Sequence, residues 1–200
     1  MSSQLKPGVK AFDAFHDYWN QLLLARRAAV KPAADECPVP LRRDFNPMKV
    51  HRHLPHIYIV ERKLPDLLEL RLSGTAIEDV AGNPLKGSNY FDFSVPEERA
   101  FTAAIVDAVI DKPCGLKMSR NVKLIGGQAY QLRSLSFPLA EEDGTPRFLL
   151  GMTNVIRDIP QSSLLSSEAV RVTINDFSFI DIGAGTPPKP NKRGADFTSV

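Results

Sequence analysis

Three closely spaced histidines are the first residues in the sequence that could do chemistry. His51, His53 and His56 lie within the stretch HRHLPH, and imidazole nitrogens bind zinc, copper and nickel. The stretch lies in a proline-rich region, and no acidic or thiol ligand stands beside it. A His-x-His pattern on an irregular polar segment is more typical of a solvated loop than of a metal centre. We therefore predict no metal site.

A glycine-containing stretch, GTAIEDVAGNPLKG, resembles a phosphate-binding loop at first sight. Gly82 and Gly87 have the spacing of a P-loop, but Lys86 precedes the second glycine instead of following it. The spacing also differs from that of a dinucleotide-binding loop. The Gly-Asn-Pro stretch that begins at Gly82 is typical of a turn, and we expect a positive φ at Gly82 after a short helix. The stretch therefore turns the chain and binds no nucleotide.

Acidic residues could supply general acids and bases, but their positions favour a simpler interpretation. Three acidic groups, at 78–79, 97–98 and 141–143, fall in turns or at the start of a helix. Solvation and helix capping explain such positions better than paired acid/base chemistry does. The chain has no G-x-S-x-G, H-E-x-x-H or kinase motif. We predict no catalytic residue and no enzymatic activity.

The two cysteines and the overall charge indicate the cellular setting. Cys37 and Cys114 lack CxxC spacing and predict free thiols in a reducing compartment. We interpret Cys114 as an ordinary small residue, with oxidation sensing by an exposed thiolate as the alternative. A net charge of +2 over 200 residues favours neither nucleic acid nor an anionic membrane as a partner. No signal sequence or membrane-length apolar run is present, so we expect a cytoplasmic protein.

Helical and strand periodicities divide the chain into three parts. Residues 1–55 comprise an amphipathic helix over 9–30 and a proline-rich connector that we expect to be extended. Residues 56–157 predict a hairpin near 57–72, a helix over 94–111 that starts with a Ser94/Glu97 capping box, and three strands near 116–124, 128–139 and 146–156. The parity of apolar residues switches within 128–139, which indicates a bulge or a strongly curved sheet.

Residues 158–200 form a tail with two different halves. Residues 170–182 are apolar and β-prone, and two roles stay open for them: adding a strand to a sheet edge, or binding a partner. The following stretch is rich in Pro, Lys and Gly, and we expect it to be disordered.

The order of these elements and four sequence motifs resemble the PAS domain, and in particular a family of stand-alone bacterial PAS proteins common in Alphaproteobacteria. The motifs are YW at 18–19, LRRDFNP with LPHIYIVER at 41–62, RLSGTAIEDVAGNPLKG at 71–87, and FPLA at 137–140. The resemblance implies an α+β fold with a five-stranded antiparallel sheet, short helices and one longer helix on one face, plus the N-terminal helix. It also implies that Gly74 and Thr75 end the second strand, and that Gly82 and Gly87 permit the turns that follow.

The resemblance further implies a sensory or regulatory role in bacterial signal transduction, through a small ligand, a signalling protein partner, or both. It places a ligand cavity between helix and sheet, with the candidate residues Tyr90, Phe101, Ile105, Met118, Leu132 and Met152 and with Arg133 as the candidate for an anionic ligand. Haem and flavin are disfavoured, because the 94–111 helix has no histidine and the chain has no reactive-cysteine segment of the flavin-binding type. No cofactor is predicted.

The N-terminal helix suggests an interface. Its apolar stripe comprises Phe12, Phe15, Trp19, Leu22 and Leu23, and the flanking helices of PAS proteins commonly pair across a two-fold axis. This implies a homodimer held together by the stripe. The alternative from another class is an enzyme with a cone-shaped α+β barrel of the ketosteroid isomerase or dehydratase type. That alternative requires an Asp, His or Tyr with a tuned pKa at an inward strand position.

Overall fold

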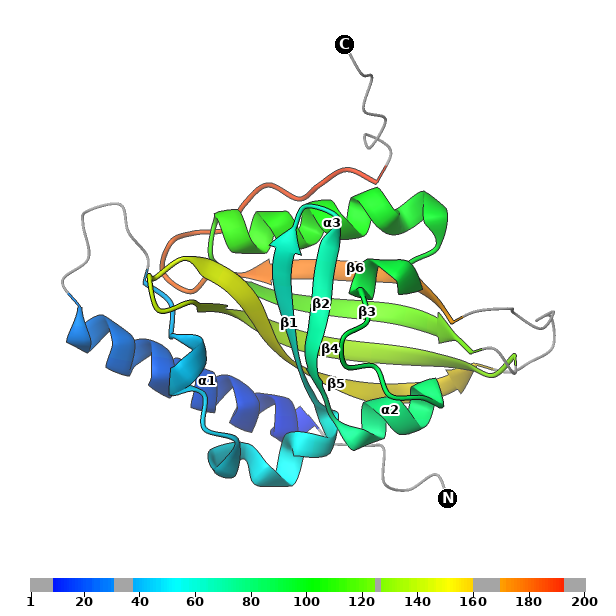
Figure 1. Cartoon of the computed structure of the whole chain (residues 1–200), viewed down its shortest axis with the longest axis horizontal. Coiled ribbons are helices and arrows are strands. Elements are labelled where there is room, and N and C mark those ends of the chain that lie inside the picture. The colour runs from blue at the N-terminus through cyan, green and yellow to red at the C-terminus, as the bar shows by residue number, and fades with distance from the viewer. Residues whose placement is uncertain (1–8, 31–37, 125–126, 160–169, 193–200) are drawn as a thin grey trace, which may run out of the picture.

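A six-stranded antiparallel sheet forms the centre of the computed structural model, which describes residues 9–30, 38–124, 127–159 and 170–192. The strand order is β2-β1-β5-β4-β3-β6. In chain order the elements are α1 (Val9–Ala29), the 3-10 helices η1 (Arg42–Asp44) and η2 (Pro47–His56), β1 (Ile57–Leu64), β2 (Leu67–Ser73), α2 (Thr75–Ala81), η3 (Tyr90–Phe93), α3 (Pro96–Asp111), β3 (Gly115–Lys123), β4 (Ala129–Ala140), β5 (Pro146–Ile159) and β6 (Arg171–Ile180). Figure 1 shows α1 and α3 on opposite sides of the sheet.

Side-chain alternation along the strands builds two cores, one on each face. Ile57 and Ile59 of β1 pack on the face that α1 covers, whereas Val60 and the neighbouring Tyr58 pack on the α3 face. In β5, Leu149 and Leu150 are both almost fully buried, on opposite faces. This confirms the central position predicted for β5, which lies between β1 and β4.

The bulge predicted in β4 is confirmed. The pairing of β4 with β5 shifts register between Gln131 and Leu132. Beyond the shift, Leu135, Phe137 and Leu139 point into the α1-side core. The parity of the apolar residues changes after the bulge because Leu132 lies on the α3 face of the sheet, whereas the later apolar residues pack on the α1 face.

The tail supplies the sixth strand, so the predicted five-stranded sheet is too small by one. β6 pairs antiparallel with β3, and its register runs from Gly115–Ile180 to Lys123–Arg171. Residues 170–182 therefore extend the sheet of their own chain, which was one of the two roles left open. The predicted boundary at residue 158 cuts this sheet. Of the stretch predicted to be disordered, residues 193–200 lie outside the described part.

The connector before β1 corrects another prediction. Residues 47–56 form η2, which consists of two 3-10 segments joined by a kink at Val50. The Asn46 side chain caps the first segment by accepting a hydrogen bond from Met48 N. The prolines exclude a regular α-helix here, but a short 3-10 helix tolerates Pro47 at its first position.

The predicted Ser94/Glu97 capping box is wrong. The cap residue of α3 is Val95, whose side chain has no polar group to accept a hydrogen bond. Ser94 instead donates to Thr102 Oγ1 at 3.2 Å, and Thr102 donates to the Glu98 carbonyl. The Ser94 hydroxyl is thus hydrogen-bonded to a side chain within α3 and does not cap the helix.

Candidate ligand-binding site

A cavity of about 100 Å³ opens on the α3 side of the sheet, between α2, η3 and residues of all six strands. One water molecule needs about 10–15 Å³ on this measure, so the cavity has room for a molecule of about seven to ten non-hydrogen atoms. Most of its wall is apolar and comes from different elements, with Ile77 and Val80 on α2, Leu132 on β4 and Val155 on β5. The polar side chains in the wall include Arg120, Tyr58, Tyr90, Thr153 and His56.

Arg120 is a buried cation in the cavity wall. It lies on β3 at the same parity as Met118 and Val122, so the strand directs it inward, and only 6% of its surface is exposed. Its Nη1 donates to the Tyr90 hydroxyl, and its Nη2 lies 3.4 Å from Thr153 Oγ1. Burial lowers the pKa of Arg120, but Tyr90 and Tyr58 raise it by more, so the guanidinium is charged at neutral pH.

Tyr58 occupies its place because β5 has a glycine opposite it. Tyr58 pairs with Gly151 across the β1–β5 ladder, and its hydroxyl lies 2.7 Å from Ser136 Oγ on β4. A Cβ at Gly151 would lie 2.2 Å from Tyr58 Cζ. Burial raises the pKa of Tyr58 above its usual value, so this phenol is protonated at neutral pH.

His56 is a neutral group in the wall. It ends η2 and is 9% exposed. Burial lowers its pKa, and the charge of nearby His53 lowers it further. Because the usual imidazole pKa is about 6.5, His56 carries no charge at neutral pH.

The glycines of the 74–87 stretch place α2 over the cavity. Gly74 lies directly before α2, and a Cβ there would lie 2.3 Å from the carbonyl oxygens of Leu54 and Pro55. Gly82 ends α2 with a φ of 76°, and Gly87 has a φ of 88°. These backbone conformations agree with the predicted turn function, and the positive φ expected at Gly82 is confirmed.

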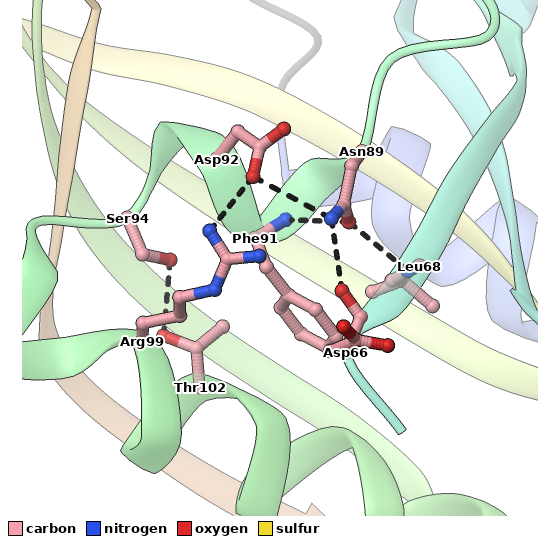
Figure 2. Close-up of polar contacts among 8 residues, drawn as sticks. All are labelled: Asp66, Leu68, Asn89, Phe91, Asp92, Ser94, Arg99 and Thr102. Carbon is pink, nitrogen blue, oxygen red and sulfur yellow. Dashed lines mark hydrogen bonds and ion pairs between the residues drawn. The ribbon is translucent and has the colours of Figure 1, made fainter. Parts of the chain in front are cut away.

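An asparagine network fixes η3, which carries Tyr90 (Figure 2). Asn89 Oδ1 accepts hydrogen bonds from Leu68 N at 3.1 Å and from Phe91 N at 3.2 Å. Its Nδ2 donates to the Asp66 carbonyl at 2.9 Å. One side chain therefore ties the β1–β2 turn and the edge strand β2 to the first turn of η3.

The structure brings together only part of the predicted cavity set. Tyr90 and Leu132 line the cavity. Phe101, Ile105 and Met118 instead fill the core beneath α3, where Phe101 packs edge-on against Phe177 of β6. Strand β6 contributes Ile174 and Phe177 to this core.

Two candidates lie on the other face of the sheet. Met152 is fully buried in the α1-side core, because it follows Gly151 by one residue and alternation turns it away from the cavity. Arg133 is exposed. The β4 bulge precedes Leu132, so Leu132 faces the cavity and Arg133 faces away.

Sequence reasoning missed Arg120, although a signal was present. The predicted strand alternates buried Leu116, Met118, Val122 and Leu124 with polar residues, and Arg120 holds an apolar-parity position in that pattern. Burying a cation is costly unless its charge is paired, so a cation at a buried strand position indicates that a partner for the charge lies nearby. The sequence carried no comparable signal for Tyr58 or for His56. The position of His56 depends on the 3-10 helix η2, which was not expected.

The other residues considered for chemistry do not form a second centre within the described part of the chain. No three His, Cys, Asp or Glu side chains there come together as a metal site. His51 is exposed, and its Nδ1 lies 2.9 Å from the Met48 carbonyl. Cys114 is fully buried, and burial raises its pKa to about 12. Burial therefore rules out the exposed-thiolate alternative for Cys114, whereas Cys37 lies outside the described residues.

The dimer stripe is also placed differently from the prediction. Phe15 and Trp19 are 0% exposed within a single chain, and they pack with Leu23 against the sheet. Phe12 and Leu22 are partly buried against the same core. A side chain without exposed surface cannot contact a second copy, so Phe15 and Trp19 cannot form the predicted dimer interface. Helix α1 packs on its own sheet instead.

Comparison with known proteins identifies the family. The model of the PAS domain matches residues 8–154, which is most of the chain, and the chain belongs to this family. Its α+β architecture, an antiparallel sheet with helices, is PAS-like. A comparison with curated proteins gave no match.

Among solved structures, the chain is similar to the crystal structure of the Rhodobacter sphaeroides LOV protein, at 14% identity and a TM-score of 0.42. The match covers 50% of this chain and 58% of that protein. An RsLOV variant is similar at 17% identity and a TM-score of 0.43, over 52% of this chain and 62% of that one. This chain therefore spans less than two thirds of either protein. Within the described residues, no helix has the length and apolarity to cross a membrane.

Proposed function

We propose that this PAS domain is a sensory or regulatory module that binds a small molecule in the cavity beneath α2 and has no catalytic output. The observation that carries the proposal is the cavity itself, which combines an apolar wall with a few convergent polar side chains. This is the composition expected of a small-ligand site. Several elements contribute to the wall, so a bound molecule would be in contact with β1, α2, η3 and β6 at once.

The position of the cavity suggests how ligand binding could change the surface of the domain. Helix α2 and the loop that contains Leu85 form part of the wall. The loop lies between Gly82 and Gly87, which both have a positive φ, and α2 lies directly before it. A ligand that binds one conformation of these segments more tightly would increase the population of that conformation. Ligand binding could in this way alter the surface that α2 and the loop present. A homodimer and a signalling protein partner stay predictions from the sequence resemblance, without the α1 stripe as the interface.

A cavity-filling variant tests the proposal. Val155→Phe adds a ring to the cavity wall, where Val155 is 7% exposed. Leu24→Phe is the matched control, because Leu24 is 67% exposed on α1, away from the cavity. Native mass spectrometry of the purified full chain would then measure bound small molecules. We expect one molecule per chain in the wild type and in Leu24→Phe, and none in Val155→Phe.

The opposite result is equally clear. If Val155→Phe folds with native circular dichroism and still carries the same molecule at the same stoichiometry, the ligand binds elsewhere. If the wild type carries no molecule and none from a metabolite extract binds to it, the proposed function is wrong.

A further inference from the structure

We infer that the ligand of this cavity is a small apolar monocarboxylate, whose carboxylate group binds the buried guanidinium of Arg120. The inference rests on the proposed function and names the chemical class of its ligand.

The charge of Arg120 is the first argument. The side chain is buried and protonated, yet the ion pairs among the described residues include no carboxylate partner for it. Its contacts are the Tyr90 hydroxyl and the Thr153 hydroxyl, together with a cation–π contact to the Tyr90 ring, whose centroid lies 5.8 Å from Arg120 Cζ. Removing a guanidinium from water costs several kcal/mol, on the order given for buried ions. Neutral hydroxyl groups offset only part of this cost, and an anion would offset much more.

The free donor of Arg120 is the second argument. Arg120 Nε is buried and has no hydrogen-bond partner among the described residues. In a guanidinium the Nε–H group and one Nη–H group point from the same edge, and this edge matches the two oxygens of a carboxylate. The 3.4 Å contact to Thr153 is long for a hydrogen bond, so this part of the guanidinium can exchange partners at low cost.

The rest of the wall sets the net charge and the body of the ligand. Arg120 is the cation among the residues that line the cavity, because His56 is neutral at neutral pH. One buried positive charge is matched by one negative charge, which favours a monocarboxylate over a phosphate dianion. The remaining wall, including Ile77, Val80 and Val155, is apolar and fits a hydrocarbon body.

Titration of the apo full chain with hexanoate and with hexanamide tests the inference. Each has about eight non-hydrogen atoms, within the range that the cavity admits. The two molecules share shape and apolar body and differ in charge. Calorimetry at neutral pH should show saturable one-to-one binding of hexanoate, with hexanamide at least about ten-fold weaker, since a hydrogen bond to a charged group contributes about 1.5–3 kcal/mol.

Variants then assign the charge to a residue. Arg120→Gln should weaken hexanoate binding by about ten-fold or more while leaving hexanamide binding nearly unchanged. Arg120→Lys retains the charge and should keep part of the preference for hexanoate. Arg133→Gln is the control, because Arg133 is exposed on the other face of the sheet. It should bind both molecules as the wild type does. Because the amide and acid are compared on the wild type, the test stands even if an Arg120 variant fails to fold.

The outcomes separate the two proposals. Equal binding of hexanamide and hexanoate, both lost in Val155→Phe, would overturn the monocarboxylate inference and leave the ligand-binding function standing. A preference for hexanoate that Arg120→Gln retains would overturn the role of Arg120. No binding of hexanoate would overturn the inference, and native mass spectrometry of the purified chain would then decide separately whether the cavity holds another molecule.

Discussion

At the scale of single residues, a glycine shapes the wall of the cavity. Gly151 leaves room for the Tyr58 ring to cross β5 and reach Ser136 on β4. Gly151→Ala would place a methyl group 2.2 Å from Tyr58 Cζ, so the ring must move and its hydrogen bond with it. We predict a loss of about 1–3 kcal/mol in the free energy of unfolding, the usual cost of overpacking. Urea unfolding at neutral pH measures it.

A double-mutant cycle isolates the cause. In a Tyr58→Ala background, the added methyl group has no ring to displace, so Gly151→Ala should cost much less there. A cost that is the same in both backgrounds would show that Tyr58 is not the reason for the glycine.

Prediction of single residues from the sequence succeeded where local backbone rules apply and failed where tertiary structure determines which face a side chain occupies. Gly82 was predictable because a positive φ after a short helix is a local property. Arg133 was misplaced because the bulge in β4 and the alternation after it decide which face the side chain is on. Met152 was misplaced because alternation along β5 turns it to the α1 face. Arg120 could have been found, since its parity is visible in the sequence.

At the scale of elements, β6 is held to α3 by a buried carboxylate. Glu98 Oε2 accepts a hydrogen bond from Ile174 N at 2.7 Å, and Glu98 Oε1 pairs with Lys192. Ile174 stands opposite Arg120 in the β3–β6 ladder, so this contact also supports the cavity wall.

Glu98→Ala should loosen β6 while the other strands stay intact. The Ile174 N–H group would lose its acceptor, which costs about 1–3 kcal/mol for a buried group. Hydrogen exchange should therefore show lower protection of the β6 amides, with β4 and β5 unchanged. Glu97→Ala is the matched control, because Glu97 is exposed in the same turn of α3. Uniform loss of protection across the whole sheet would contradict a local role for Glu98.

The elements themselves were largely predictable. Periodicity places α1, the β1–β2 hairpin, α3 and the three strands β3 to β5 close to their observed bounds. The 3-10 helix η2 was missed because proline density excludes an α-helix but does not distinguish an extended chain from a 3-10 turn. The start of α3 was predicted wrongly because the Ser94 hydroxyl donates a hydrogen bond to Thr102 in the folded chain and is therefore not the helix cap.

At the scale of the whole molecule, α1 is part of the domain core. Trp19 stacks on Phe137 of β4 with ring centroids 4.5 Å apart, and its Nε1 donates to the Pro138 carbonyl at 3.2 Å. The sequence identified this stripe as apolar but not which surface would cover it, because helical spacing is the same for a dimer interface and for a face of the same chain.

Trp19→Ala should therefore reduce stability and leave the oligomeric state unchanged. We predict a loss of about 3–5 kcal/mol in the free energy of unfolding, as for other large-to-small changes at buried aromatic residues. Light scattering of the folded variant should give the same mass as the wild type. A wild-type dimer that Trp19→Ala converts into a stable monomer would contradict the placement of α1.

The most direct test of the account is a crystal structure of the full chain grown with hexanoate. We predict one hexanoate in the cavity, with its carboxylate oxygens about 2.7–2.9 Å from nitrogens of the Arg120 guanidinium, Nε among them, and its carbon chain against α2 and β5. A cavity without hexanoate, or a hexanoate whose carboxylate points away from Arg120, would contradict it.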